Sequence, residues 1–193
     1  MARFVLGIGG YMGSGKTLAG RFFESKGALF IDADAVVSEL YQPGRDGHRK
    51  IVNFFGEEFL KKDGQIDRAK LGKFVFSDPN KLKILNHTIH PLVTNEIQKK
   101  LDAAGDRFVV IEASYFEPQQ LGRFIDALLW IDCRLDLLLR RALERPGMTE
   151  KRFRSILLTQ IKPEKVDYRL KNEGNEEDFY AALEEVRQKM KLD

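Results

Sequence analysis

Residues 10–17 read Gly-Tyr-Met-Gly-Ser-Gly-Lys-Thr and match the pattern G-x-x-x-x-G-K-[S/T] at every fixed position. Residues 4–8, ahead of the motif, are apolar and of strand type, and residues 18–23 behind it begin a helix. A strand, a tight glycine turn and a helix form the context that a phosphate-binding loop requires. This context disfavours the alternative, a chance glycine-rich turn. The sequence therefore predicts a P-loop that holds a nucleoside triphosphate.

Each fixed position of the predicted loop has a physical task. Backbone N–H groups at a helix N-terminus point at bound phosphates, and the helix dipole favours the anion. Glycines let the backbone adopt positive φ and pass close to the ligand. We expect Lys16 to reach the terminal phosphates and the Thr17 hydroxyl to ligate Mg²⁺. The loop residues predicted to hold ATP are Met12, Gly13, Ser14, Gly15, Lys16 and Thr17.

The composition indicates a globular chain of 193 residues that is large enough to bury a sizeable core. Hydrophobic residues make up 43% of the chain and charged residues 32%, which excludes a disordered protein. The net charge of +3 argues against bulk nucleic-acid binding. No apolar run approaches the ~20 residues that span a bilayer, so we expect no membrane association.

Cys133 is the only cysteine, so no disulfide can form within the chain. This fits a reducing cytosol, and the N-terminus runs into a strand without a signal peptide, so we expect a cytoplasmic protein. Because Cys133 follows an apolar run, we interpret it as a small core residue rather than a nucleophile. The oligomeric state stays open, a homo-oligomer included.

Short apolar runs alternate with helical patterns, which predicts an α/β fold: a parallel sheet with helices on both faces. Residues 35–100 are mainly helical and too long for a simple crossover. We expect them to form a substrate-side subdomain inserted into a single domain over residues 1–193. The five predicted strands cover residues 4–8, 28–31, 108–111, 127–131 and 168–170.

Asp32 and Asp34 follow the second predicted strand, at the sheet edge where ligands bind in open α/β folds. Residues two apart in an extended segment face the same side, so both carboxylates are expected beside the P-loop. One carboxylate would accept the proton of an attacking hydroxyl, and the other would hold the metal ion or its waters. The alternative is that both acids only cap the following helix. We favour function, because position and pairing agree.

An arginine-rich helix over residues 135–145 stops at Pro146-Gly147. Arg141 and Arg145 lie four apart and share a helix face, with Arg140 beside them. Guanidinium forks suit the charge on a moving phosphate, and the helix break suits the hinge of a lid. The alternative is a solvated helix face.

The predicted lid spans about residues 135–162. Thr149 can cap its second helix, on which we place Gln160, and Asn175 is expected to cap a last helix after the lid.

His90 forms a His-Pro pair with Pro91, three residues after His87, and we expect this pair to end one helix and start another. Such a corner could line an acceptor pocket, although a lone histidine is more often a capping or packing residue. No third ligand is evident, which disfavours a zinc site. Nor does the chain contain the Asn-Lys-x-Asp segment expected of a GTPase.

Taken together, these residues make the chain resemble the dephospho-coenzyme A kinase family over almost its full length. Residues 7–17 resemble that family's opening, Gly-Leu-Thr-Gly-Gly-Ile-Gly-Ser-Gly-Lys-Ser, and Asp32-Ala33-Asp34 follow at the family's spacing. Residues 67–76 and 85–93 are similar to its Arg-x-x-Leu-x-x-x-Val-Phe and Leu-x-x-Ile-x-His-Pro-x-Val segments. Its lid and C-terminal pattern is matched by Arg141, Arg145, Gln160, Asp167 and Asn172-Glu173-Gly174.

The chain also departs from the family pattern. Gly9 stands where threonine is usual, Ile156 where an arginine is common, and Val166 where alanine is usual. Residues 112–117 replace the family's Pro-Leu-Leu-x-Glu, and only the final acid, Glu117, is kept. This altered segment is expected to border the acceptor.

The resemblance implies a nucleoside-monophosphate-kinase-like P-loop fold with a helical acceptor domain and a lid. It also implies that ATP, with Mg²⁺, phosphorylates the ribose 3′-hydroxyl of dephospho-CoA. On this reading Asp34 takes the ribose proton while Asp32 assists. Arg141 stabilises the transferring phosphate, with Arg140 and Arg145 in support. Asn172 would lie near the adenine. The residues expected on the acceptor side are Leu71, Phe76, His90 and Glu117.

Two other functions stay open at this point. One is a kinase of the same fold that acts on another small hydroxyl substrate. The other is a nucleotide-binding switch that hydrolyses slowly and works by binding a partner. The paired aspartates and the arginine-rich lid disfavour the switch.

Overall fold

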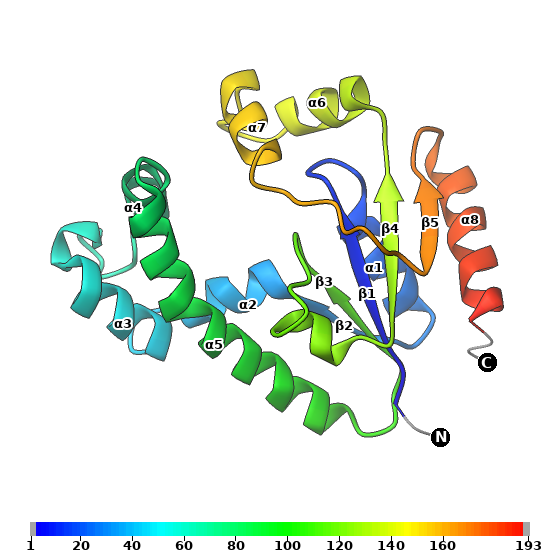
Figure 1. The fold of residues 1–193 in the computed structure, drawn as a ribbon, viewed down its shortest axis with the longest axis horizontal. Helices are drawn as coiled ribbons and strands as arrows, with labels where there is room; N and C mark the ends of the chain where they lie inside the picture. Colours follow the sequence, from blue (N-terminus) through cyan, green and yellow to red (C-terminus); the bar gives the residue numbers. More distant parts are fainter. Residues whose placement is uncertain (1–2, 191–193) are drawn as a thin grey trace. The chain divides into compact units, whose positions relative to one another are not determined.

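The computed structural model describes residues 3–190 of the chain. They divide into two compact units (Figure 1). The first unit contains the residues up to Asp32 together with those from Ala104 onward, and the second contains Ala33–Ala103. The first unit is built around a sheet, and the second is helical.

The sheet of the first unit has five strands, all parallel, in the order β2-β3-β1-β4-β5. The two strands beside β1, which are β3 and β4, are apolar except for their last residues, Glu112 and Asp132, and β1, β3 and most of β4 are buried. Strands buried on both faces read as continuous apolar runs, which is why the sequence revealed them. The five-stranded parallel sheet is therefore confirmed. The strands are β1 (Val5–Gly10), β2 (Leu29–Asp32), β3 (Val109–Glu112), β4 (Ala127–Asp132) and β5 (Tyr168–Lys171).

Two helices of the first unit pack on the sheet and on each other. Helix α1 (Lys16–Ser25) buries Phe23, and α8 (Glu176–Lys189) buries Leu183, in one core with Leu6, Ile8 and Leu129 of the sheet. The predicted cap of α8 is present, since the Asn175 side chain accepts a hydrogen bond from the Asp178 N–H. A short 3₁₀ turn, η2 (Leu121–Phe124), precedes β4.

The other two helices of this unit, α6 (Leu135–Leu143) and α7 (Glu150–Leu157), have a small core of their own. It consists of Leu138, Ala142 and Phe153. Figure 1 shows both helices beyond the arrowhead of β4, on the side of the sheet that carries the loop after β1. Thr149 caps α7 as predicted, because its hydroxyl accepts a hydrogen bond from the Arg152 N–H.

The second unit consists of four α-helices and a 3₁₀ turn. Asp67 caps the third of these helices through the Lys70 N–H, and a ring contact between Phe59 and Phe74, with centroids 5.0 Å apart, joins that helix to the turn. The elements are α2 (Ala33–Leu40), α3 (Asp46–Phe55), η1 (Glu57–Phe59), α4 (Arg68–Phe76) and α5 (Pro79–Ala104). In the described part of the chain, none of the helices, α5 included, combines the length and apolar character needed to cross a membrane.

The expectation that the His90-Pro91 pair separates two helices is wrong, because α5 continues through it. Proline inside a helix removes one backbone hydrogen bond and costs ~3 kcal/mol. Apolar side chains on both sides of the proline offset this cost. Ile89, Val93, Ile97 and Leu101, spaced by four, are all buried and hold one face of the helix in the core.

Gly9 has a structural reason to stand where the family pattern has threonine. It lies opposite Trp130 in the β1–β4 register, and a Cβ on Gly9 would be 2.8 Å from a carbon of the indole ring. The ring is buried, its Nε1 donates to Asp132, and Tyr11 of the P-loop packs edge-on against it. The glycine and the tryptophan therefore form a matched pair.

We predict that Gly9→Thr lowers the free energy of unfolding by about 1–3 kcal/mol, the usual cost of overpacking a core. Urea denaturation measures this change. In a Trp130→Leu background, where the ring is gone, the same substitution should cost clearly less. An equal cost in both backgrounds would show that the indole ring is not the obstacle.

Candidate active site

The loop between β1 and α1 has the backbone geometry of an anion site. Gly15 is the N-cap of α1 with a φ of +98°, and Gly13 has a φ of +86°, both of which strongly favour glycine. The Ser14 N–H donates to the Tyr11 carbonyl at 3.1 Å and closes the loop. The first N–H groups of α1 have no partner within the helix and carry its positive dipole end. This arrangement fits a bound phosphate.

Other parts of the first unit pack closely behind the loop. A Cβ on Gly15 would lie 2.3 Å from the Asn172 amide nitrogen, and one on Gly13 would lie 2.9 Å from the Leu138 carbonyl of α6. Side chains at either position would collide with these groups. The loop is therefore held in place from behind as well as shaped by its own glycines.

Lys16 and Thr17, the two polar residues that end the motif, have different surroundings. The Lys16 ammonium lies 3.4 Å from the Tyr11 carbonyl of its own loop. The Thr17 hydroxyl donates to Glu112 Oε1 at 3.0 Å. Glu112 is the last residue of β3, and only 8% of its surface is exposed. A hydroxyl and a buried carboxylate thus meet beside the P-loop, and both offer the oxygen atoms that Mg²⁺ prefers.

Sequence reasoning missed Glu112, because it treated residues 112–117 only as a departure from a family pattern. A usable signal was present. Glu112 is an acid directly after the apolar run 108–111, at the strand end where parallel sheets place their ligands. The register also pairs Glu112 with Asp32, so two carboxylates end neighbouring strands.

Asp34 does not extend the strand, contrary to the expectation that Asp32 and Asp34 share one extended segment. Strand β2 ends at Asp32, and α2 begins at Ala33, which places Asp34 in the first helical turn. An acid in this turn is stabilised by the helix dipole. The Asp34 side chain is exposed. The two aspartates therefore do not share one face of an extended strand. Because the Asp34 side chain is exposed, a substrate can reach it.

The prediction that Gln160 lies on α7 is wrong, because that helix ends at Leu157. Pro163 disfavours helical conformation in the residue before it, and the chain leaves the helix ahead of that point. The Gln160 side-chain oxygen instead accepts a hydrogen bond from the Met12 N–H at 2.9 Å. The segment after α7 is thereby attached to the P-loop.

Arg141 points its guanidinium at backbone carbonyls rather than into solvent. Its Nη1 lies 3.3 Å from the Gly13 carbonyl and 3.1 Å from the Asn172 carbonyl. Asn172 is only 6% exposed, and its Nδ2 donates to the Ser14 carbonyl at 2.9 Å. Arg140 and Arg145, by contrast, are exposed. Two residues that the sequence placed at the phosphate and at the adenine thus meet each other at the P-loop.

Comparison with known proteins identifies the family. A sequence model described as dephospho-CoA kinase matches residues 4–178. The chain belongs to the dephospho-CoA kinase family. Members of this family are phosphotransferases that carry out the last step of coenzyme A synthesis.

Individual relatives agree with this assignment. A dephospho-CoA kinase of Streptomyces avermitilis is 35% identical over 83% of this chain and 78% of its own. The dephospho-CoA kinase of Campylobacter jejuni has a similar structure, with a TM-score of 0.65, 25% identity and 96% coverage of both chains. The protein TT1252 from Thermus thermophilus superposes with a TM-score of 0.82 at 25% identity, over 98% of both chains.

The residues that the family pattern assigns to the acceptor side have varied surroundings. Leu71 is 2% exposed and packs in the core of the helical unit, so its side chain supports the fold. Phe76 is 65% exposed, and His90 is half-buried on α5. The Glu117 carboxylate accepts a hydrogen bond from the Gln120 side chain. Only the position of Phe76 combines a large apolar side chain with open surface.

Cys133 agrees with its interpretation as a packing residue. It is half-buried against the small core of α6 and α7. Burial raises the pKa of its thiol, an effect that the nearby Arg141 only partly opposes. A thiol with a raised pKa is mostly protonated at neutral pH and is a poor nucleophile.

Proposed function

We propose that this kinase transfers the γ-phosphoryl group of ATP to the ribose 3′-hydroxyl of dephospho-CoA, with Mg²⁺ as cofactor. The family assignment supports the reaction. The observation that carries the proposal is the P-loop with its Thr17–Glu112 pair at the end of the sheet. In the transfer, the ribose oxygen forms a bond to the γ-phosphorus, the bond to the β–γ bridging oxygen breaks, and ADP leaves.

The experiment that tests this function is ADP release from Mg-ATP with and without dephospho-CoA, together with the mass of the product. Strong stimulation and a gain of one phosphate are expected. A gain on another hydroxyl compound instead would indicate a kinase of the same fold with a different acceptor. ATP use that no acceptor stimulates would favour a nucleotide switch.

At the nucleotide, the backbone N–H groups of residues 13, 15 and 16 are proposed to hold the β-phosphate, because those of Met12 and Ser14 donate to Gln160 and to the Tyr11 carbonyl. Lys16 would reach towards the γ-phosphate. Thr17 would ligate Mg²⁺ directly, and Glu112 would orient that hydroxyl or accept a hydrogen bond from a water on the metal. The chemistry that the cation supplies is neutralisation of charge on the phosphate oxygens. The hydrogen bond from Thr17 to Glu112 supports this assignment.

We predict that Glu112→Gln raises the Mg²⁺ concentration needed for half-maximal activity by about 10–100-fold, as expected when a group that orients a metal ligand is lost. Steady-state rates over a magnesium titration measure this. Glu24→Gln is the matched control, since Glu24 is an exposed acid on α1 that pairs with Arg21. An unchanged magnesium requirement in the Glu112 variant would exclude its role.

Asp34 is our first choice for the group that accepts the ribose proton, with Asp32 in support. Its exposed carboxylate in the first turn of α2 is accessible to a substrate hydroxyl. Asp32 is half-buried and paired in register with Glu112, which suits a role in positioning water or metal. The two acids therefore differ in surroundings, and their variants should differ in effect.

We predict that Asp34→Asn lowers kcat by about 10²–10⁴-fold, the usual contribution of a general base, and changes ATP binding much less. Rapid-quench or coupled assays give kcat, and calorimetry gives the affinity for nucleotide. Asp32→Asn should instead affect the magnesium dependence. A turnover within a few-fold of the parent protein would remove Asp34 from the role of base.

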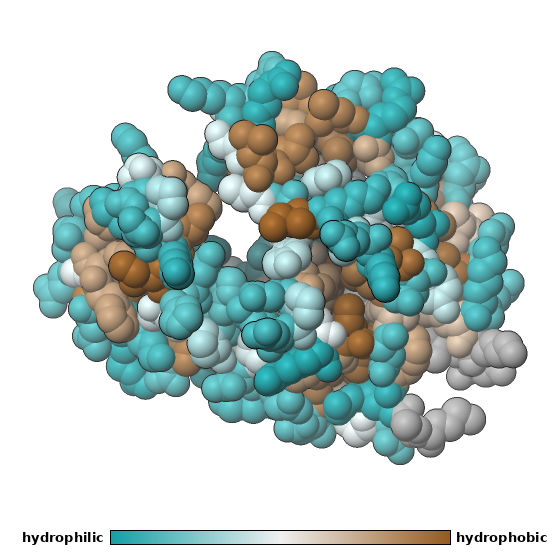
Figure 2. Space-filling model, in the orientation of Figure 1, coloured by the Kyte–Doolittle hydropathy of each residue, from teal (hydrophilic) through white to brown (hydrophobic). Residues whose placement is uncertain are grey.

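The lid is proposed to span about residues 135–162 and to close over the nucleotide, with Arg140 and Arg145 meeting the transferring phosphate. Both guanidinium groups are exposed, which supports this role. Apolar surface is visible over the region of α6 and α7 in Figure 2. Exposed apolar side chains there, which lid closure would cover, include Leu135, Leu143, Leu158 (88% exposed) and Ile161.

A cytoplasmic location is proposed from the single unpaired cysteine.

The helical unit is proposed to bind the acceptor, because it contains a cavity suited to an anionic substrate arm. This cavity has a volume of about 600 Å³ between α3 and α5. Lys50, Lys83 and His87 line it together with Phe54 and Ile84. Lysines suit the diphosphate of dephospho-CoA, and the apolar side chains suit its pantetheine chain.

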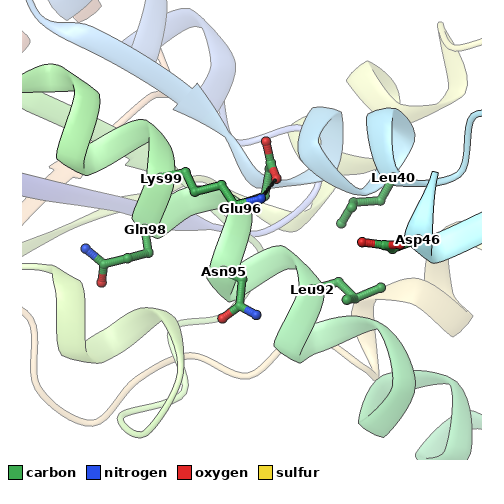
Figure 3. A pocket seen from close by; sticks show the side chains of 7 residues that line it. All are labelled: Leu40, Asp46, Leu92, Asn95, Glu96, Gln98 and Lys99. Carbon is green, nitrogen blue, oxygen red and sulfur yellow. Dashed lines mark hydrogen bonds and ion pairs between the residues drawn. The ribbon is translucent and has the colours of Figure 1, made fainter.

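A second cavity in the same unit, of about 270 Å³, is less suitable. Figure 3 shows its lining, in which Lys99 is turned towards Glu96 from the same helix. The two side chains form an ion pair at 3.2 Å, and Asp46 adds a further acid. The negative charges of this lining disfavour a diphosphate.

We predict that Lys50→Ala with Lys83→Ala raises KM for dephospho-CoA by about tenfold or more, since charge-assisted bonds to phosphate are lost. The inhibition constant of adenosine, which lacks both the diphosphate and the arm, should stay unchanged. Lys62→Ala, an exposed lysine of the same unit outside the cavity, serves as the control. Equal losses for both ligands would place the arm elsewhere.

A further inference from the structure

We infer that Arg141 and Asn172 are positioning residues that act on the nucleotide through the P-loop backbone, and that neither side chain reads the nucleotide directly. The inference goes beyond the proposed function and rests on it in one respect, that the P-loop binds the β-phosphate. We call these two side chains the P-loop clamp. Both belong to the same compact unit as the loop.

The clamp holds two successive carbonyl groups of the loop. Arg141 Nη1 lies 3.3 Å from the Gly13 carbonyl, and Asn172 Nδ2 lies 2.9 Å from the Ser14 carbonyl. The two side chains are also joined to each other, since Arg141 Nη1 donates to the Asn172 carbonyl at 3.1 Å and Nη2 lies 3.5 Å from Asn172 Oδ1. Residues more than 120 positions away in sequence thus fix the loop from behind.

Peptide geometry converts this hold into an arrangement of donors. In a trans peptide the carbonyl and the following N–H point in opposite directions. The hydrogen bond from Asn172 to the Ser14 carbonyl therefore turns the Gly15 N–H away from Asn172, towards the inside of the loop. In the same way, Arg141 at the Gly13 carbonyl turns the Ser14 N–H inward, where it meets the Tyr11 carbonyl at 3.1 Å. The clamp sets the direction of loop N–H groups before a phosphate arrives.

The clamp leaves little freedom for other roles of Asn172. This residue is 6% exposed, and its backbone N–H donates to the Asp132 carbonyl at 2.9 Å. Its amide nitrogen donates a hydrogen bond to the Ser14 carbonyl, and its amide oxygen faces Arg141 Nη2. The side chain also fills the space behind Gly15, where a Cβ would come within 2.3 Å of it. A side chain so buried and so engaged is poorly placed to recognise an adenine ring.

Arginine is suited to its half of the clamp for two reasons. Its planar fork places Nη1 against the Gly13 and Asn172 carbonyls while Nη2 faces Asn172 Oδ1, an arrangement of two nitrogens that the single nitrogen of lysine cannot reproduce. Its permanent positive charge, close behind the loop, also favours an anion on the other side.

The test measures binding of Mg-ADP and of inorganic tripolyphosphate by calorimetry, and kcat/KM with ATP and with GTP. We expect Asn172→Ala, which removes the donor to Ser14 without introducing a charge, to weaken both ligands by at least tenfold. The ratio of kcat/KM for ATP to that for GTP should stay the same. Arg141→Ala should behave likewise, and the double variant should lose much less than the product of the two single losses.

Two controls keep the result interpretable. Arg134→Ala removes an exposed arginine at the start of α6 that pairs with Asp136, and should change neither binding constant. Arg141→Lys retains the charge without the fork, and should recover only part of the affinity. Thermal unfolding of each variant checks that the protein is folded. If Asn172→Ala does not fold, Asn172→Asp, which keeps the shape of the side chain, takes its place.

Several outcomes would overturn the clamp. A lost preference for ATP over GTP with unchanged tripolyphosphate binding would mean that Asn172 contacts the base. A fall in kcat for Arg141→Ala with unchanged Mg-ADP affinity would mean that Arg141 contacts the transferring phosphate. Absence of ADP and tripolyphosphate binding in the parent protein would instead remove the P-loop function on which the clamp rests.

Discussion

The left-handed backbone at Gly13 and Gly15 is the constraint on which the first unit depends. It turns the chain from the central strand β1 into α1 and leaves helix N–H groups open to a phosphate. The glycines permit this conformation but do not enforce it, because glycine has the widest backbone freedom of any residue. Contacts from α6 and from Asn172 supply the enforcement, and they leave no room for a Cβ at either position.

The sheet edge gathers polar groups for a similar reason. Parallel strands end on the same side, so Glu112, Asp32 and the loop after β1 lie at one edge without any local sequence signal linking them. Glu112 remains buried there through its hydrogen bond to Thr17, because a buried carboxylate is costly unless it is paired. Trp130 and Gly9 add the packing that keeps β1 and β4 together beneath this edge.

The features that the sequence predicted correctly are those with local causes. Apolar runs marked the strands, and the caps at Thr149 and Asn175 marked helix starts, since each depends on residues within one turn. The P-loop was equally clear, because all of its fixed positions lie within eight residues. The helical segment around Pro91 was misread for the opposite reason. Whether a helix survives a proline depends on the burial of its flanks, which sequence alone does not state.

The site was predicted less completely than the fold. Lys16 and Thr17 follow from the motif, but the contacts of Gln160, Arg141 and Asn172 with the loop join residues 128 to 158 positions apart. A family resemblance indicated that these residues matter, and it did not say through which atoms. Asp34 shows the same limit on a smaller scale, because one residue decides whether a strand continues or a helix begins.

The order of the chain has a consequence for its biosynthesis. Ser14 of the P-loop is synthesised 158 residues before Asn172, which forms the back wall of the loop. Strand β1 likewise pairs with β3 and β4, which are made about a hundred residues later. At the usual 5–20 residues per second, the nascent loop waits on the order of ten seconds for these partners. Nucleotide binding therefore requires that synthesis has passed Asn172, and a translation product interrupted before that residue would carry the complete motif without a formed site.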